Sequence, residues 1–100
     1  MRLTEEQRNI IKSTLLKHFG KESKFYLFGS RVDDNKRGGD IDLYIEASFS
    51  DRRQINDAKI NTAVEFIKLL GERKIDIVVH GFGAEMLPIH KVAQYTGVEL

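Results

Sequence analysis

The sequence predicts an α+β fold in which helices pack on a mixed β-sheet, in the order α-β-β-α-β-α. Three observations carry this prediction. Short runs rich in aromatic and β-branched residues indicate three strands, apolar residues at helical spacing indicate three helices, and glycine or proline punctuates the boundaries. A chain of 100 residues has the length of one domain, so we expect residues 1–100 to fold as a single unit.

The first helix is expected over residues 5–19. Thr4 supplies a side-chain oxygen for the free amides of the first turn, and Gln7 three residues later completes the pattern of a capping box. The apolar positions recur at helical spacing until Gly20 ends the pattern. These positions are Ile11, Leu15, Leu16 and Phe19.

Two strands follow the first helix. Residues 25–28 (Phe-Tyr-Leu-Phe) are aromatic and bounded by turn residues, which is typical of a buried strand. Residues 31–39 are expected to form a polar loop, and residues 40–46 the second strand. Because a single loop joins the two strands, we expect them to run antiparallel if they are neighbours.

A second helix then returns the chain to the other end of the sheet. Ser50 or Asp51 is available as its N-cap, and Gly71 ends it. Apolar side chains repeat at helical spacing along it: Ile60, Val64 and Ile67, flanked by Ala63 and Leu70. The β-branched residues 75–79 form the third strand, which a right-handed crossover places parallel to the second.

The last helix is expected to begin at Pro88, because proline suits the first helical position. Ile89, Val92 and Ala93 share one face of it, and Gly97 caps its end. No repeat, linker or low-complexity segment interrupts this order.

The amino-acid composition is that of a globular protein and excludes several kinds of site. Hydrophobic residues make up 41% of the chain and charged residues 31%, which are globular values. The absence of cysteine excludes disulfides and thiolate metal sites. No apolar stretch approaches the ~20 residues that span a membrane, and the N-terminus is not a signal peptide, so we expect a cytoplasmic protein without a membrane partner.

The net charge is only +1, but basic residues gather around the Gly-Ser turn at residues 29–30. They are Lys17, His18, Lys21, Lys24, Arg31, Lys36 and Arg37. This pattern suits a polyphosphate better than a long duplex, so direct binding of nucleic acid is not expected.

Three carboxylates are the candidate catalytic and metal-ligating residues. Asp40 and Asp42 alternate on one strand and therefore point to the same face. Asp76 is the one charge inside the third strand, and the topology brings it to the same end of the sheet. Hard oxygen ligands on rigid strands suit Mg²⁺, and three of them could hold two ions ~3.5–4 Å apart for an in-line phosphoryl displacement.

The turn that precedes these acids is the candidate nucleotide-binding segment. Gly29 has no Cβ to keep phosphate away from backbone amides, and the Ser30 hydroxyl adds a hydrogen-bond donor. The Arg31 guanidinium can donate two hydrogen bonds to phosphate oxygens.

Other polar residues are assigned no catalytic role. Tyr44 and Glu46 share the face of the acids, and Glu46 is expected to be solvated. His80 and His90 have no metal-ligand spacing with each other or with His18, so structural or surface roles are expected for them.

These motifs resemble a known family. Gly29-Ser30, then Asp40 and Asp42 after nine residues, with Asp76 on a later strand, resembles the nucleotidyltransferase superfamily of DNA polymerase beta. The short chain and residues 88–98 are similar to the minimal nucleotidyltransferases of prokaryotes, including antitoxins of the MntA type. The resemblance implies the palm-like nucleotidyltransferase fold.

The implied reaction is transfer of a nucleoside monophosphate, AMP if the donor is ATP rather than another nucleoside triphosphate. Ser30 would contact the triphosphate, Asp40 and Asp42 would ligate two Mg²⁺ ions, for which Mn²⁺ could substitute, and Asp76 would favour the nucleophile. The acceptor implied by the resemblance is a hydroxyl of a helical partner protein, a HEPN-domain toxin that the chain would neutralise.

Two alternatives stay open. The chain could neutralise such a partner by direct contact, as a binding module without turnover, or it could transfer the nucleotide to a small molecule, as aminoglycoside nucleotidyltransferases do. A homo-oligomer or a hetero-oligomer is compatible with each of these proposed functions.

Overall fold

The computed structural model describes residues 4–28, 41–71 and 75–100. In chain order its elements are α1 (Glu5–Phe19), β1 (Lys24–Phe28), β2 (Ile41–Glu46), α2 (Arg52–Leu70), β3 (Ile75–His80), α3 (Pro88–Thr96) and β4 (Val98–Glu99). The predicted α-β-β-α-β-α order is confirmed, and the short β4 is an addition to it. None of the helices in these ranges is long and apolar enough to cross a membrane.

The helix termini follow from local chemistry. The Thr4 hydroxyl accepts from the Gln7 amide at 3.1 Å, and the Gln7 side chain accepts from the Thr4 amide at 3.2 Å, which confirms the capping box. Asp51, rather than Ser50, caps α2 by accepting from the Arg53 amide at 3.0 Å. Gly20, which follows α1, has φ +87°, a left-handed value that side-chain-bearing residues rarely adopt.

The sheet has four strands in the order β3-β2-β1-β4. β1 runs antiparallel to β2, with Leu27 opposite Leu43, and β2 runs parallel to β3, with Leu43 opposite Ile77. Both predicted directions are therefore confirmed. β4 pairs antiparallel with β1, and the Leu100 amide extends this pairing by donating to the Phe25 carbonyl at 2.9 Å.

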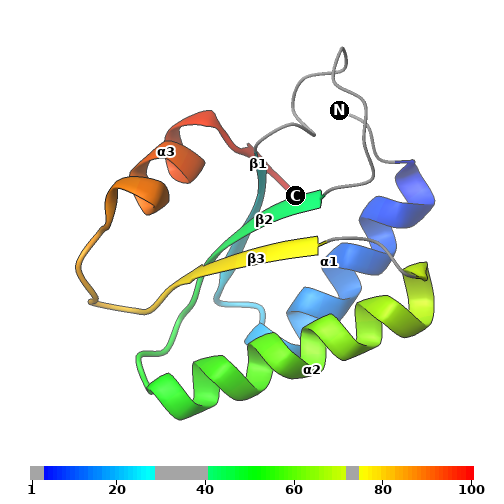
Figure 1. Cartoon of the computed structure of the whole chain (residues 1–100), viewed down its shortest axis with the longest axis horizontal. Helices are drawn as coiled ribbons and strands as arrows, with labels where there is room; N and C mark the ends of the chain where they lie inside the picture. The colour runs from blue at the N-terminus through cyan, green and yellow to red at the C-terminus, as the bar shows by residue number, and fades with distance from the viewer. Residues whose placement is uncertain (1–3, 29–40, 72–74) are drawn as a thin grey trace.

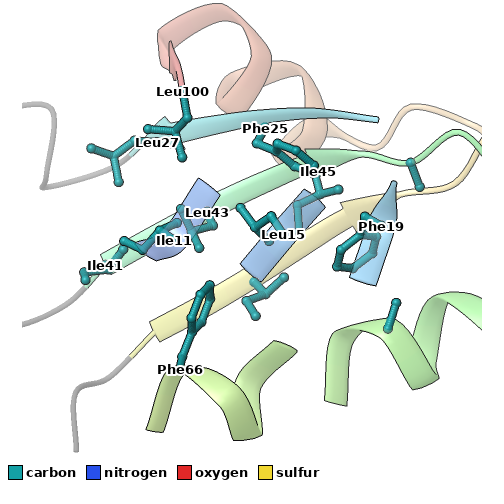
Figure 2. Packing of buried hydrophobic residues seen from close by; sticks show 13 residues of the cluster. Ile11, Leu15, Phe19, Phe25, Leu27, Ile41, Leu43, Ile45, Phe66 and Leu100 are labelled. Carbon is teal, nitrogen blue, oxygen red and sulfur yellow. The ribbon is translucent and has the colours of Figure 1, made fainter. Parts of the chain in front are cut away.

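One face of the sheet carries the main core. Figure 1 shows α1 and α2 side by side beneath this face, and Figure 2 shows the side chains that meet there. The strands contribute alternate residues, as the pleat requires. The fully buried members include Ile11 and Leu15 from α1 and Ile41, Leu43 and Ile45 from β2, and Phe66 of α2 packs with them.

The other face of the sheet is covered by α3 (Figure 1). Ala93 of this helix packs with Phe28 of β1 and Tyr44 of β2 in a second buried cluster, which Tyr26 and Val78 border. Because side chains alternate along a strand, Asp42 and Glu46 of β2 share the face of Tyr44. The polar residues of the sheet are therefore on the α3 side.

Two apolar stripes of the sequence lie mainly outside the core. The residues of α2 that are buried are Ala58, Thr62 and Phe66, whereas Ile60, Val64 and Ile67, which identified the helix, are exposed. In α3, Ala93 is buried but Ile89 and Val92 are exposed. Periodicity located the helices correctly but did not indicate the face that each one buries.

Candidate active site

The parallel register of β2 and β3 places Asp42 beside Asp76. Neighbouring strands lie ~4.8 Å apart, and both side chains are on the face of Tyr44 and Val78. Asp42 is half-buried and Asp76 is exposed. Phe28, the last residue of β1, is the register partner of Asp42 on its other side. The two carboxylates thus stand where β1 ends and where β2 and β3 begin.

The other predicted site residues are Gly29, Ser30, Arg31 and Asp40, and all four lie outside the described residues. Within residues 4–28, 41–71 and 75–100, no group of three or more histidine or acidic side chains is arranged to hold a metal ion. The structure therefore brings two of the three predicted acids together.

The pair of carboxylates has a donor set that fits a divalent cation. Like charges at adjacent register positions repel each other, and a hard cation between them would relieve that repulsion. Mg²⁺ is commonly bound through one or two carboxylates, with substrate phosphates and water as its other ligands. Two aspartates are therefore enough protein ligands for this ion.

The basic cluster predicted around the Gly-Ser turn lies only partly within the described residues, because residues 29–40 are outside them. Lys17 and His18 lie on α1 and contact Glu65 of α2, with nitrogen–oxygen distances of 2.9 and 3.2 Å. The hydrogen bond from Lys17, followed by that from His18, lowers the pKa of Glu65. Lys24 lies at the opposite end of β1 from Phe28, where it pairs in register with Glu46. Lys24 therefore lies at the end of β1 away from the predicted turn, contrary to the prediction, whereas Lys17 and His18 are engaged with Glu65. Arg31, Lys36 and Arg37 lie outside the described residues.

A second polar group occupies the other end of the same sheet face. The Tyr44 hydroxyl donates to Oε1 of Glu46, and Oε2 of Glu46 lies 3.1 Å from Nδ1 of His80. Nε2 of His80 lies 2.7 Å from the carbonyl oxygen of Ala84. Both ring nitrogens of His80 thus face acceptors, and both contacts are satisfied only when the ring is protonated.

The pKa of His80 agrees with this arrangement. Burial by itself lowers the pKa of His80, but the hydrogen bonds to the Ala84 carbonyl and to Glu46, with the charge of Glu46, raise it above 6.5. Glu46 is only partly solvated: 26% of its side chain is exposed, and its carboxylate is engaged by Tyr44 and His80.

His90 of α3 is the neutral counterpart of His80. Its Nδ1 accepts from the Leu87 amide at 3.1 Å, which requires an unprotonated nitrogen. Its ring centroid lies 5.1 Å from that of His80 and 6.0 Å from that of Tyr44. Burial, followed by the charge of His80, lowers the pKa of His90 below 6.5. The expected structural role of both histidines is consistent with their burial at 8% exposure.

Sequence reasoning had assigned no joint role to this group. The signal for it was the alternation along β2 and β3, where Glu46 and His80 follow Asp42 and Asp76 at even spacing and are register partners. Its position is separate from the acidic pair, because Glu46 and His80 end the strands that Asp42 and Asp76 begin. A hollow of about 570 Å³ adjoins this far end, lined in part by Lys24, Glu46 and Phe82.

Comparison with known proteins identifies the family of this chain. Residues 8–97 match the family model of the nucleotidyltransferase domain. No curated protein matches the chain. The matched segment spans all three helices in large part and includes Asp42 and Asp76, and the mixed four-stranded sheet with three helices is consistent with a nucleotidyltransferase fold. The chain therefore belongs to the nucleotidyltransferase domain family, within the polymerase beta-like superfamily.

Proposed function

We propose that this chain transfers AMP from ATP to a hydroxyl group of a partner protein. The observation that carries the proposal is the register pairing of Asp42 with Asp76 on one face of a sheet in a nucleotidyltransferase domain. Nucleotidyl transfer itself follows from the family. The identity of the donor and the acceptor is the part that we propose.

We assign a role to each acid from its position. Asp42 and Asp76, together with Asp40, would hold the divalent cation, Mg²⁺ or Mn²⁺ in its place. When bound, such a cation neutralises charge on the phosphate oxygens and polarises the α-phosphorus. Asp76 is the exposed member, and we assign to it the orientation of the acceptor hydroxyl and the uptake of its proton.

The transfer is a single displacement. The acceptor oxygen forms a bond to the α-phosphorus of ATP, the bond from that phosphorus to the bridging oxygen breaks, and pyrophosphate leaves with the electron pair. Gly29 and Ser30 would donate hydrogen bonds to the triphosphate, and Arg31 would pair with its oxygens.

Exposed apolar side chains near this face support a protein acceptor. Ile89, Val92 and Tyr95 of α3 are 47%, 55% and 93% exposed, and α3 packs on the sheet face that carries Asp42 and Asp76. A macromolecule that covered them would gain apolar contact on the side of the sheet that carries the reacting groups. In keeping with the family resemblance, we propose a HEPN-type helical protein as the partner and neutralisation of its toxicity as the outcome.

The test is to purify the chain with the protein encoded beside it and to weigh both by intact mass spectrometry after incubation with Mg²⁺ and ATP. We expect the partner to gain the mass of one or more AMP groups. The Asp76→Asn and Asp42→Asn variants should abolish this gain, and Glu85→Gln, which alters an exposed acid away from both strands, should preserve it.

A different result identifies the alternative. If an Asp40→Ala/Asp42→Ala variant neutralises the partner as well as the unaltered chain does, and neither produces a mass gain, neutralisation proceeds by binding alone. AMP transfer to a small hydroxylated molecule with no gain on any protein would overturn the proposed acceptor while leaving the family reaction in place.

A further inference from the structure

The outward face of α2 carries an apolar stripe that the fold leaves uncovered. Ile60, Val64 and Ile67 are 60%, 46% and 57% exposed. They recur at positions i, i+4 and i+7 and therefore share one face of the helix. The buried residues of α2, which include Thr62 and Phe66, are on the other side of it. A contiguous exposed stripe of branched aliphatic side chains commonly marks an interaction surface.

This stripe is remote from the proposed reaction. α2 packs beneath the sheet face that contains Leu43 and Ile77, whereas Asp42 and Asp76 are on the face covered by α3. A partner seated on α2 would therefore not contact the acidic pair. The surface requires an explanation other than delivery of the acceptor.

The spacing of the stripe fits a second copy of the same helix in the opposite direction. Ile60 and Ile67 lie on either side of the central Val64, four and three residues away. Reversal of the helix about a two-fold axis near Val64 maps the stripe onto itself, so Ile60 of each copy meets Ile67 of the other. A surface that is complementary to itself in this way is what a two-fold dimer needs.

The charges beside the stripe favour the same arrangement. At ~100° per residue, Asp57 and Lys68 project from the same flank of α2, near its two ends. Both are exposed, and neither makes a hydrogen bond or ion pair with the other residues that the structure describes. In an antiparallel pair, Asp57 of each copy comes within about one turn of Lys68 of the other. A parallel pair would leave these residues ~16 Å apart along the axis.

A hollow on the same flank would receive the incoming carboxylate. It measures about 230 Å³ between α1 and α2 and is lined by His18, Asn61, Val64, Glu65 and Lys68. Glu65 is already paired with Lys17 and His18. The rim of the hollow therefore presents the ammonium of Lys68 to an anionic partner.

From these observations we propose that the chain forms a two-fold dimer through α2, with the two helices antiparallel. Ile60 of one copy packs on Ile67 of the other, and the two Val64 side chains meet near the axis. Asp57 of each copy pairs with Lys68 of the other, so that the two ion pairs lie on the same flank, one at each end of the helix pair. The dimer leaves both α3 faces open, so each copy keeps its acidic pair accessible.

Sedimentation velocity over a concentration series tests the association. We expect the mass to rise from 11.5 kDa to twice that value with increasing concentration. Val64→Asp should keep the chain monomeric, and Val92→Asp, the same change at an exposed position of α3, should leave the dimer intact. A monomer at every concentration, or a dimer that tolerates Val64→Asp, would overturn the proposal.

Single cysteines test the direction of the helices, because the chain has no cysteine of its own. Val64→Cys should form a disulfide-linked dimer on mild oxidation. Ile60→Cys and Ile67→Cys should cross-link when mixed but not when oxidised separately, since equivalent Cα atoms at position 60 would be ~10 Å or more apart along the axis. Self-linkage of Ile60→Cys at the rate of Val64→Cys would overturn the antiparallel arrangement.

Charge reversal tests the flanking pairs. Asp57→Lys should raise the dimer dissociation constant roughly fivefold, the size expected of an exposed ion pair. Lys68→Asp in the same chain should restore it, and each single variant should prefer the other as partner when the two are mixed. Additive weakening in the double variant would show that the proposed pairing does not form.

Discussion

Asp42 on β2 and Asp76 on β3 are register partners in the parallel pair of strands, on the sheet face that α3 covers. Apolar residues on either side of Asp42 point into the opposite core, which fixes the direction of its side chain. The sheet therefore holds the two carboxylates at adjacent register positions, where a bound cation would neutralise part of their charge.

We predict that Asp76→Asn abolishes stabilisation by Mg²⁺ and ATP without loss of the fold. Asp76 is exposed and one negative charge of the pair is removed, so the melting temperature without ligand should stay level or rise. Ligand at ~100 times its dissociation constant stabilises a protein by about 2.7 kcal/mol. A thermal-shift assay with and without Mg²⁺ and ATP should show this gain in the unaltered chain but not in Asp76→Asn. Glu85→Gln is the control that keeps the shift, and a full shift in Asp76→Asn would exclude this residue from the site.

Stability should reach a maximum near pH 6.5 because the two buried histidines titrate in opposite directions. The pKa of His80 is raised above 6.5, so its contribution is fully present below that pH and is lost as the pH rises through the folded-state pKa. The pKa of His90 is lowered, so its contribution is present above pH 6.5 and is lost as the pH falls through the folded-state pKa.

Urea unfolding on both sides of pH 6.5 measures this profile. We expect His80→Gln to flatten the alkaline decline and leave the acidic side unchanged. His90→Asn, whose side-chain oxygen can still accept from the Leu87 amide, should flatten the acidic decline. Variants that alter neither slope would show that other groups dominate the pH dependence.

The buried hydroxyl of Thr62 should lower the stability of the protein. Thr62 is fully buried on α2, and its Oγ1 has no hydrogen-bond partner among the residues that the structure describes. Valine has nearly the same shape without the polar atom, so Thr62→Val should raise the free energy of unfolding by about 1 kcal/mol.

Thr14 is the matched control for that substitution. It is also buried, but its hydroxyl donates to the Ile10 carbonyl at 2.8 Å. Thr14→Val therefore loses a hydrogen bond and should lower the free energy of unfolding by about 1 kcal/mol. Equal effects of the two substitutions in denaturant titrations would contradict the assignment of Thr62 as unsatisfied.

The topology could be predicted because it depends on chain order and turn chemistry. One loop between β1 and β2 implied an antiparallel pair, and a helix between β2 and β3 implied a parallel pair, which together placed Asp76 beside Asp42. The residues that would complete the site, Asp40 among them, lie outside the described residues. Their roles stay predictions.

The packing of α2 could not be predicted from its sequence. The apolar stripe through Val64 is more regular than the face that is buried, which includes Ala58 and Thr62. Spacing identifies a helix, but the face that it buries depends on the sheet and on α1, which supply the opposing surface. The strand β4 could not be predicted, because a segment of two residues is too short to show periodicity. Val98 and Glu99 form a strand only by pairing with β1.

Gly97 should be intolerant of a side chain, since it joins α3 to β4 at a crowded point. Its amide donates to the Ala93 carbonyl at 2.8 Å, and a Cβ at this position would lie 2.5 Å from that oxygen and 3.0 Å from Cβ of Tyr26. Gly97→Ala must therefore push α3 away from β1, and we expect the free energy of unfolding to fall by roughly 1–3 kcal/mol.

Gly81 offers the comparison, because a Cβ there would meet the flexible end of the Ile55 side chain at 3.1 Å instead of backbone. Gly81→Ala should therefore lower the free energy of unfolding clearly less than Gly97→Ala does, as measured by denaturant titration. Hydrogen exchange should localise the damage of Gly97→Ala to α3 and to the amide of Leu100, which bonds the Phe25 carbonyl, before β2 and β3 lose protection. Uniform loss of protection across the sheet would instead show that α3 and β4 unfold together with the main core.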